Sequence, residues 1–342
     1  MTSYAIDIGT LLSPQAEVLY AKWRYNVRKR IVRLNGDTYV LCRFRNGRVL
    51  DHFEKTLMRI ADGGVAVQPV KARTRALGER LRFGHWIALG HVPGEPLIKR
   101  IPRPSIASLA RNLGRLHSLQ GPQIQSLFSR QRPELPHLTY LANNDHLSEE
   151  NRDWIRAGFT RLLQTKSTSL THGDLFGSNV IRAKDQSVTL IDYELLAYEY
   201  AGVELAACLL RNYCRIKDHQ QVFLRAYLES CSPELRAAWE DHGRDFLFAG
   251  AARLALQRRQ RARSIRIRDQ FNQLQRWAWP FASREALRRQ HENNVALIES
   301  RKASADYYDH IARSTADLCR KHADLDPLTL LQMIGESDAK PD

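Results

Sequence analysis

The sequence predicts an α+β protein with two unlike parts, a small, mostly antiparallel sheet with one helix followed by a mainly helical remainder. Up to Val92, short runs of β-branched and aromatic residues alternate with turn residues, which is typical of strands. Beyond Pro93-Gly94, apolar residues recur at helical spacing. The 342 residues leave room for a large core, and 43% hydrophobic with 26% charged residues is ordinary globular composition. Disorder throughout, a collagen-like chain and a small disulfide-stapled scaffold are therefore excluded.

The clearest element near the N-terminus is a hairpin. Val27–Leu34 and Thr38–Phe44 are predicted strands, and Asn35-Gly36 between them tolerates the positive φ angles of a tight turn. The pattern then predicts three more elements: a helix over Asp51–Ala61 that ends at Gly63-Gly64, and strands over Val65–Val70 and Trp86–Val92.

The remainder begins with an amphipathic helix. Ile106, Leu109, Leu113 and Leu116 form one apolar stripe, and Ser105 is available as its N-cap. Further along, the pattern predicts a helix over Ser148–Leu163, a break in helical periodicity over residues 170–192, and mostly helix from Ala201 to about Ile334.

The net charge indicates which kinds of partner the protein could bind, and the cysteine content indicates the cellular compartment in which it resides. The formal net charge is +15, and a surface this basic attracts phosphate esters, nucleic acid or an acidic membrane face. The five cysteines are scattered without a CxxC pair, which is atypical of a disulfide framework and typical of a reducing compartment. No run approaches ~18 consecutive apolar residues, and the N-terminus lacks the pattern of a secretory signal. We therefore expect a soluble, cytoplasmic protein.

The stretch from Thr171 to Glu194 carries the most chemistry. Asp174 and Asn179 lie five residues apart in a glycine-containing loop, THGDLFGSN. Val180-Ile181 and Val188–Ile191 are predicted to pair as an antiparallel hairpin, which brings Asp192 back beside Asn179. Carboxylate and amide oxygens are ligands that Mg²⁺ accepts, and a carboxylate that does not bind the metal can orient and deprotonate an attacking hydroxyl. This is the division of labour of phosphoryl transfer.

These two motifs, HGDLFGSN and LIDYE, resemble those of the aminoglycoside phosphotransferase and choline kinase superfamily, which are small-molecule kinases with a protein-kinase-like fold. The resemblance covers roughly residues 20–210. It implies a bilobal fold, with residues 1–92 as a nucleotide-binding lobe and residues 93–342 as a catalytic and acceptor-binding lobe. It also implies ATP and Mg²⁺ as cofactors.

The resemblance assigns roles to particular residues of the large lobe. Asp174 falls on the catalytic base, and Asn179 and Asp192 fall on the two metal ligands. His172 occupies the position of a histidine that supports the loop. One departure is Glu204, which stands where the family has an aspartate that supports the catalytic loop.

In the small lobe, the resemblance implies that Arg43 contacts the α- and β-phosphates and that Glu54 is its ion-pair partner. Arg45, Arg48 and the stretch Lys22–Arg30 are alternatives to Arg43, and Asp51 is an alternative to Glu54. The hinge that would hydrogen-bond adenine is expected at Leu89, Gly90, His91 and Val92. The turn expected to cover the phosphates, within residues 22–26, contains no glycine, so the way in which they are covered stays open.

A basic segment, Arg253–Arg268, carries seven arginines and no acid, and Arg259, Arg263 and Arg266 share one helical face. Three interpretations stay open: a solvated face, a wall of the acceptor cleft that binds an anionic substrate, or a dock for an anionic membrane. Nucleic acid is disfavoured, because no aromatic residues of an RNA-binding kind are interleaved with the arginines. The aromatic residues of Trp277–Phe281 are expected in the core rather than in a cage for a quaternary ammonium.

The function that follows is ATP- and Mg²⁺-dependent phosphorylation of a hydroxyl on a small molecule of the aminoglycoside, choline, sugar or amino-alcohol type. Two alternatives remain. One is a kinase that acts on a lipid or glycan at an anionic membrane surface, and the other is a non-catalytic kinase-like scaffold.

Overall fold

The computed structural model of the chain describes residues 6–24, 27–74, 83–97, 101–119, 139–141, 144–165, 168–211, 214, 217–275 and 284–337. The chain divides into two compact units. The first unit consists of residues 1–131, 170–198 and 225–232, and the second consists of residues 132–169, 199–224 and 233–342. The stretch from Thr171 to Glu194 that carries the two motifs therefore belongs to the same unit as the N-terminal sheet.

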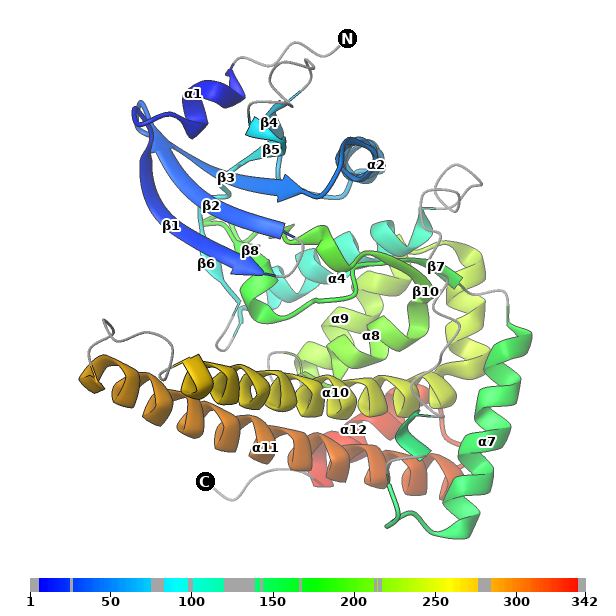
Figure 1. Cartoon of the computed structure of the whole chain (residues 1–342). Coiled ribbons are helices and arrows are strands. Elements are labelled where there is room, and N and C mark those ends of the chain that lie inside the picture. Colours follow the sequence, from blue (N-terminus) through cyan, green and yellow to red (C-terminus); the bar gives the residue numbers. More distant parts are fainter. Residues whose placement is uncertain are drawn as a thin grey trace. The chain divides into compact units, whose positions relative to one another are not determined.

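A five-stranded antiparallel sheet dominates the first unit (Figure 1). Its spatial order is β1-β2-β3-β5-β4. The strands are β1 (Glu17–Arg24), β2 (Val27–Leu34), β3 (Asp37–Phe44), β4 (Val70–Arg73) and β5 (His85–Gly90). The Asn35-Gly36 turn is confirmed, because both residues have positive φ, 53° and 85°.

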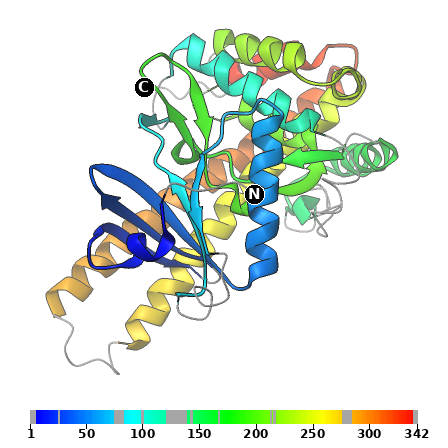
Figure 2. The same ribbon diagram turned by 90° about the horizontal axis from the view of Figure 1, so that it is seen from above.

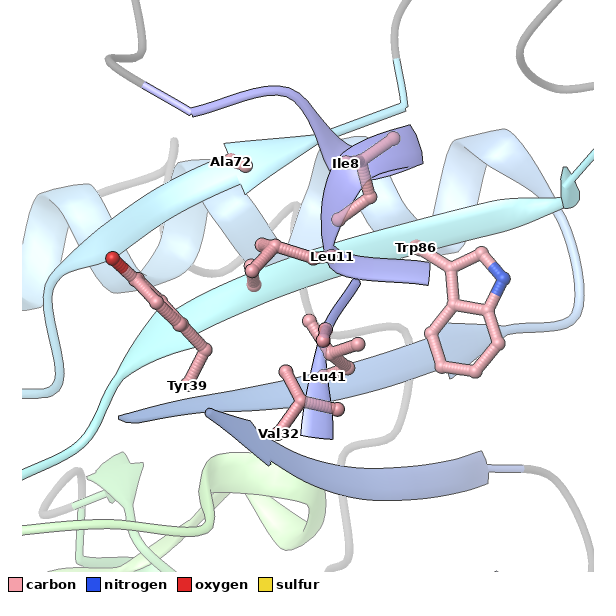
Figure 3. Packing of buried hydrophobic residues seen from close by; sticks show 9 residues of the cluster. Ile8, Leu11, Val32, Tyr39, Leu41, Ala72 and Trp86 are labelled. Atoms are coloured by element: carbon pink, nitrogen blue, oxygen red, sulfur yellow. The ribbon is translucent and has the colours of Figure 1, made fainter. Parts of the chain in front are cut away.

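Two helices cover opposite faces of this sheet. On one face, Ile8 and Leu11 of α1 (Ile8–Leu12) pack against a buried cluster that includes Leu41 of β3 and Trp86 of β5 (Figure 3). On the other face, Phe53 of α2 (Gly47–Asp62) contacts Phe44 of β3, with ring centroids 4.9 Å apart. Successive residues of a strand point to opposite faces, so each side chain of β2 and β3 belongs to the face of α1 or to the face of α2.

Some boundaries differ from those predicted. Helix α2 begins four residues earlier than Asp51, because the Asn46 side chain accepts a hydrogen bond from the Val49 amide and caps it. The predicted strand over Val65–Val70 is wrong, since β4 begins at Val70 and the segment before it forms one isolated bridge, Val67 with Leu190.

A second, three-stranded sheet in the first unit has the order β6-β8-β9 and is formed by β6 (Glu95–Pro96), β8 (Val180–Arg182) and β9 (Val188–Leu190). Helix α4 (Arg103–Ser118) packs on β9. The N-cap of α4 is Pro102 rather than the predicted Ser105, whose hydroxyl instead donates a hydrogen bond to the Gln186 carbonyl at 3.1 Å.

The second unit is mainly helical. Helices α10 (Pro233–Gln275) and α11 (Arg284–Lys321) run antiparallel, side by side (Figures 1 and 2). The other helices of this part are α7 (Glu149–Gln164), α8 (Ala201–Leu209) and α12 (Pro327–Ser337), while α9 (Lys217–Ser230), β7 (Thr168–Thr171) and β10 (Ala197–Tyr200) each have residues in both units. None of the described helices combines the length and apolar composition that a membrane span requires.

The five cysteines all lie among the described residues, and all are buried thiols rather than disulfides: Cys42, Cys208, Cys214, Cys231 and Cys319. Burial raises the pKa of the Cys319 thiol to about 12, with a further contribution from the charge of Asp245.

Candidate active site

The loop that carries Asp174 depends on the glycine before it. Gly173 has a φ of +80°, a conformation that other residues adopt at a cost. A Cβ atom at this position would lie 2.3 Å from the carbonyl oxygen of Leu195. Only glycine allows the chain to pass this close to Leu195 and still present Asp174.

Asp174 and Asn179 are joined directly. The side-chain amide of Asn179 donates to the Asp174 carbonyl oxygen at 2.8 Å and to Oδ2 of the Asp174 carboxylate at 3.1 Å. Because Nδ2 faces Asp174, the Oδ1 atom of Asn179 is turned away from it. One side chain thus orients the carboxylate, while its own amide oxygen accepts from the Ser178 hydroxyl at 3.4 Å.

The predicted hairpin returns the chain to this point. Strands β8 and β9 pair antiparallel with Val180 opposite Leu190, and the Ile191 amide donates to the Asn179 carbonyl oxygen at 2.9 Å. Asp192 follows immediately, so the prediction that Asp192 lies beside Asn179 is confirmed. Asp192 itself has a left-handed backbone, with φ 67° and ψ 56°. Such strained residues are concentrated at functional sites.

His172 ties the loop to the end of β9. Its side chain is fully buried, its Nδ1 accepts from the Asp174 amide at 3.3 Å, and its Nε2 lies 2.9 Å from the Ile191 carbonyl oxygen. This pattern requires a neutral ring with the proton on Nε2, because Nδ1 faces a donor and Nε2 faces an acceptor. The histidine therefore holds together the two segments that carry Asp174 and Asp192.

A cation that the sequence analysis did not single out reaches this cluster. Lys29 of β2 donates to Oδ1 of Asp192 at 2.7 Å, and both side chains are about a quarter to a third exposed, 26% and 30%. Arg43 lies elsewhere: its guanidinium is 5.9 Å from the ring centroid of Trp86, on the face of the sheet that α1 covers.

The structure also does not bring Arg43 and Glu54 together. Glu54 of α2 forms an ion pair with Arg73 of β4, which the sequence analysis missed, and Asp51 binds the same guanidinium. Burial lowers the pKa of Arg73, but the hydrogen bonds that its guanidinium donates to the two carboxylates, together with their negative charge, outweigh burial and raise this pKa. Glu54 therefore fastens α2 to β4.

The predicted hinge forms the end of β5 and the residues after it: Leu89, Gly90, His91 and Val92. The Gly90 amide donates to the Pro69 carbonyl at 2.8 Å, and the Gly90 carbonyl accepts from the Gln68 side chain at 3.2 Å. The His91 amide donates to the Thr38 carbonyl at 3.1 Å. Within the described part of the chain, no residue hydrogen-bonds the His91 carbonyl or the Val92 amide.

The basic segment on α10 is divided between ion pairs and solvent. Arg253 pairs with Glu199 at 2.9 Å, both 12% exposed, and Arg259 pairs with Asp309 at 2.8 Å. Arg263 and Arg266 are exposed. The predicted single face of three arginines is therefore not uniform. Residues 277–281 lie outside the described part of the chain.

Glu204, which stands where the resemblance leads us to expect an aspartate, is buried in α8. Burial opposes the charge of Arg253, but Glu199 and Glu204 outweigh it, so the pKa of Arg253 is raised. Glu204 therefore contributes negative charge beside a buried arginine.

Comparison with known proteins identifies the group of enzymes. The sequence profile described as the Phosphotransferase enzyme family matches residues 24–242, more than half of the chain. The chain belongs to this family. No match to this phosphotransferase is found among curated protein sequences.

Many solved structures resemble this phosphotransferase, among them the following two. Spectinomycin phosphotransferase, APH(9)-Ia, in complex with ADP and spectinomycin, is 12% identical, with a TM-score of 0.54 over 88% of this chain and 92% of that chain. A choline/ethanolamine kinase family protein from Mesorhizobium loti is 13% identical, with a TM-score of 0.50 over 92% of each chain. These likenesses confirm the α+β protein-kinase-like fold, with a small antiparallel sheet and a mainly helical remainder.

Proposed function

We propose that this phosphotransferase moves the γ-phosphate of ATP onto a hydroxyl of a small molecule with the help of Mg²⁺. The observation that carries the proposal is the convergence of Asp174, Asn179 and Asp192 through two hydrogen bonds and one hairpin. An intact set of two carboxylates and one amide favours an enzyme over a non-catalytic scaffold.

Asp174 is the group that acts on the acceptor. Its carboxylate is held by Asn179 and stands on a loop that Gly173 and His172 fix, so it can orient the attacking hydroxyl and accept its proton. Catalysis by such a site is mostly positioning and charge stabilisation rather than covalent chemistry.

Asn179 and Asp192 would hold Mg²⁺. Their donor set fits, because Mg²⁺ is bound by one or two protein oxygens and completes its shell with water and phosphate oxygens. The Lys29 ammonium, 2.7 Å from Asp192, indicates that the position beside this carboxylate accepts a cation. When bound, the metal would neutralise charge on the phosphates.

The base of the nucleotide would bind at the hinge. Leu89 and Gly90 end β5, and His91 and Val92 follow it directly, so backbone groups of these four residues would supply the hydrogen bonds that adenine needs. We place nucleotide binding in residues 1–92, and catalysis and acceptor binding in residues 93–342. We further place the protein in the cytoplasm, where ATP is present and buried thiols stay reduced.

The test is an assay of ADP release with aminoglycosides, choline, ethanolamine, sugars and amino alcohols as acceptors, with and without vesicles of anionic lipid. Asp174→Asn should lower kcat by about 10²- to 10⁴-fold, because it removes the general base, and should leave nucleotide binding intact. Asp185→Asn is a matched control, since Asp185 lies in the exposed turn of the same hairpin and bonds locally to Ser187. A folded Asp174→Asn variant with wild-type turnover would contradict the proposal.

Turnover that needs the vesicles would favour a membrane-bound acceptor over a freely diffusing one. The exposed arginines Arg263 and Arg266 are the residues to neutralise in that case.

A further inference from the structure

We propose that Lys29 of β2 is the residue that binds the nucleotide phosphates, in place of a basic residue on β3. This inference rests on the proposed function, because it assumes that the site takes a nucleotide. It names the residue that supplies the positive charge there.

The two faces of the sheet exclude the nearest alternatives. Arg43 of β3 and Arg30 of β2 both lie over Trp86, at 5.9 and 5.7 Å from its ring centroid. Trp86 belongs to the cluster that α1 covers, together with Leu41. Both arginines therefore face away from the catalytic hairpin.

The residue of β3 on the opposite face carries no positive charge. Cys42 follows Leu41, so it points to the face of α2, and it is only 4% exposed. The position from which β3 could present a cation towards Asp192 is thus taken by a small, buried thiol.

Lys29 replaces that missing cation from the neighbouring strand. In the antiparallel register of β2 and β3, Lys29 is directly opposite Cys42, and directly opposite residues share a face with Cβ atoms about 4.5–5.5 Å apart. From there the Lys29 side chain reaches Asp192 at 2.7 Å. The positive charge is thus carried by β2 instead of β3, on the same face of the sheet.

The ion pair places Lys29 where phosphates would gather. Asp192 is assigned to Mg²⁺, and protein-bound Mg²⁺ is shared between carboxylates and substrate phosphates. An ammonium on a flexible four-carbon stem, 26% exposed, can exchange a carboxylate for a phosphate oxygen with little motion of the backbone. Arg73 lies on the same side of the sheet but is already bound by Glu54 and Asp51.

The test compares the binding of ADP and adenosine in Mg²⁺ by calorimetry, because the two ligands differ in their phosphates. The wild type should bind ADP more tightly. Lys29→Met should reduce that preference about 10- to 10²-fold, the range expected for a lost hydrogen bond to a charged group, and should leave adenosine binding unchanged. Arg30→Met is the matched control, since it removes one charge from the next residue of the same strand on the opposite face and should keep the preference.

A second variant moves the charge back to β3. In the double variant Lys29→Met/Cys42→Lys, the new lysine occupies the opposite position of the same strand pair and should restore part of the preference for ADP. A merely structural role of Lys29 would instead weaken the binding of ADP and of adenosine together, so rescue of the preference for ADP alone identifies a contact with the phosphates.

A measurement on the unaltered protein covers the case in which these variants fold poorly. Acylation of the Lys29 amine, followed by mass spectrometry, should be slowed by ADP and not by adenosine. Equal slowing by both ligands, or an undiminished preference in a folded Lys29→Met variant, overturns the assignment. A preference that disappears in Arg43→Met instead returns the role to β3. A wild type that binds neither ligand contradicts the proposed function itself, whereas the other outcomes leave it standing.

Discussion

The ion pairs of Arg73 with Glu54 and Asp51 form a clamp between α2 and β4, and burial predicts which of the two acids contributes more to stability. Arg73 is 9% exposed and is shared by two carboxylates, of which Glu54 is 9% exposed and Asp51 is 44% exposed. Breaking a buried ion pair costs about 3–5 kcal/mol, because the remaining charge is left in the interior. Asp51 still neutralises Arg73 in Glu54→Ala, so we expect a loss of about 2 kcal/mol. Asp51→Ala should cost no more than about 1 kcal/mol, as for exposed pairs.

Hydrogen exchange of the α2 and β4 amides is the appropriate assay, because the two units of the chain need not unfold together. A loss of about 2 kcal/mol corresponds to a roughly 30-fold faster exchange of amides protected by this clamp. Overall unfolding in urea serves as a second readout. Equal effects of Glu54→Ala and Asp51→Ala, or faster exchange in Asp51→Ala alone, would refute the reasoning from burial.

Three further predictions concern other parts of the fold. Gly173→Ala should cost at least about 1–2 kcal/mol and lower turnover, because φ is +80° and the new Cβ would lie 2.3 Å from a backbone oxygen; wild-type activity would contradict this. In urea, Arg161→Ala should be more destabilising than Asp245→Ala, because Asp245 is 6% exposed and Arg161 44%, so the first variant leaves a buried charge without its bidentate partner. Hydrogen bonds from Thr329 lower the pKa of the Asp326 carboxyl at the start of α12, so its contribution is present above pH ~4 and is lost as the pH falls further. Asp326→Ala should therefore cost about 1 kcal/mol at pH 7 and much less near pH 3, and a deficit that does not depend on pH would show that the charge is irrelevant.

Local patterns in the sequence predicted those parts of the fold that depend on near neighbours. The Asn35-Gly36 hairpin and the hairpin that returns Asp192 to Asn179 are both confirmed, since each is specified by a short turn between two apolar runs. The strand predicted at Val65–Val70 failed because that segment contacts β9, more than a hundred residues away in the chain. Contacts at such separation leave no periodic signal in either segment.

Prediction of the candidate site from the sequence is limited in the same way, because part of it depends on contacts between distant segments. The positions of Asp174 and Asn179 follow from one continuous motif, whereas the residue that supplies positive charge depends on which face of a sheet turns to that motif. The hairpin register already implies that Lys29 lies opposite Cys42 and that Arg43 has the opposite orientation. It does not say that α1 covers the face of Arg43, because that packing involves a short helix that the sequence analysis did not predict.

The buried thiols make it possible to measure local opening of this protein at several separate places. A thiol reacts as its thiolate, and burial raises the pKa of both Cys214 and Cys319, so the native chain should be nearly inert to alkylating reagents. Each cysteine can then be modified only when its own surroundings open, and the rate of modification measures the free energy of that opening. Modification of Cys42 reports the opening of the sheet in the first unit, and modification of Cys319 reports the opening of α11 in the second. A ligand that stabilises one unit alone would slow the modification of the cysteine in that unit and leave the rate of modification in the other unit unchanged.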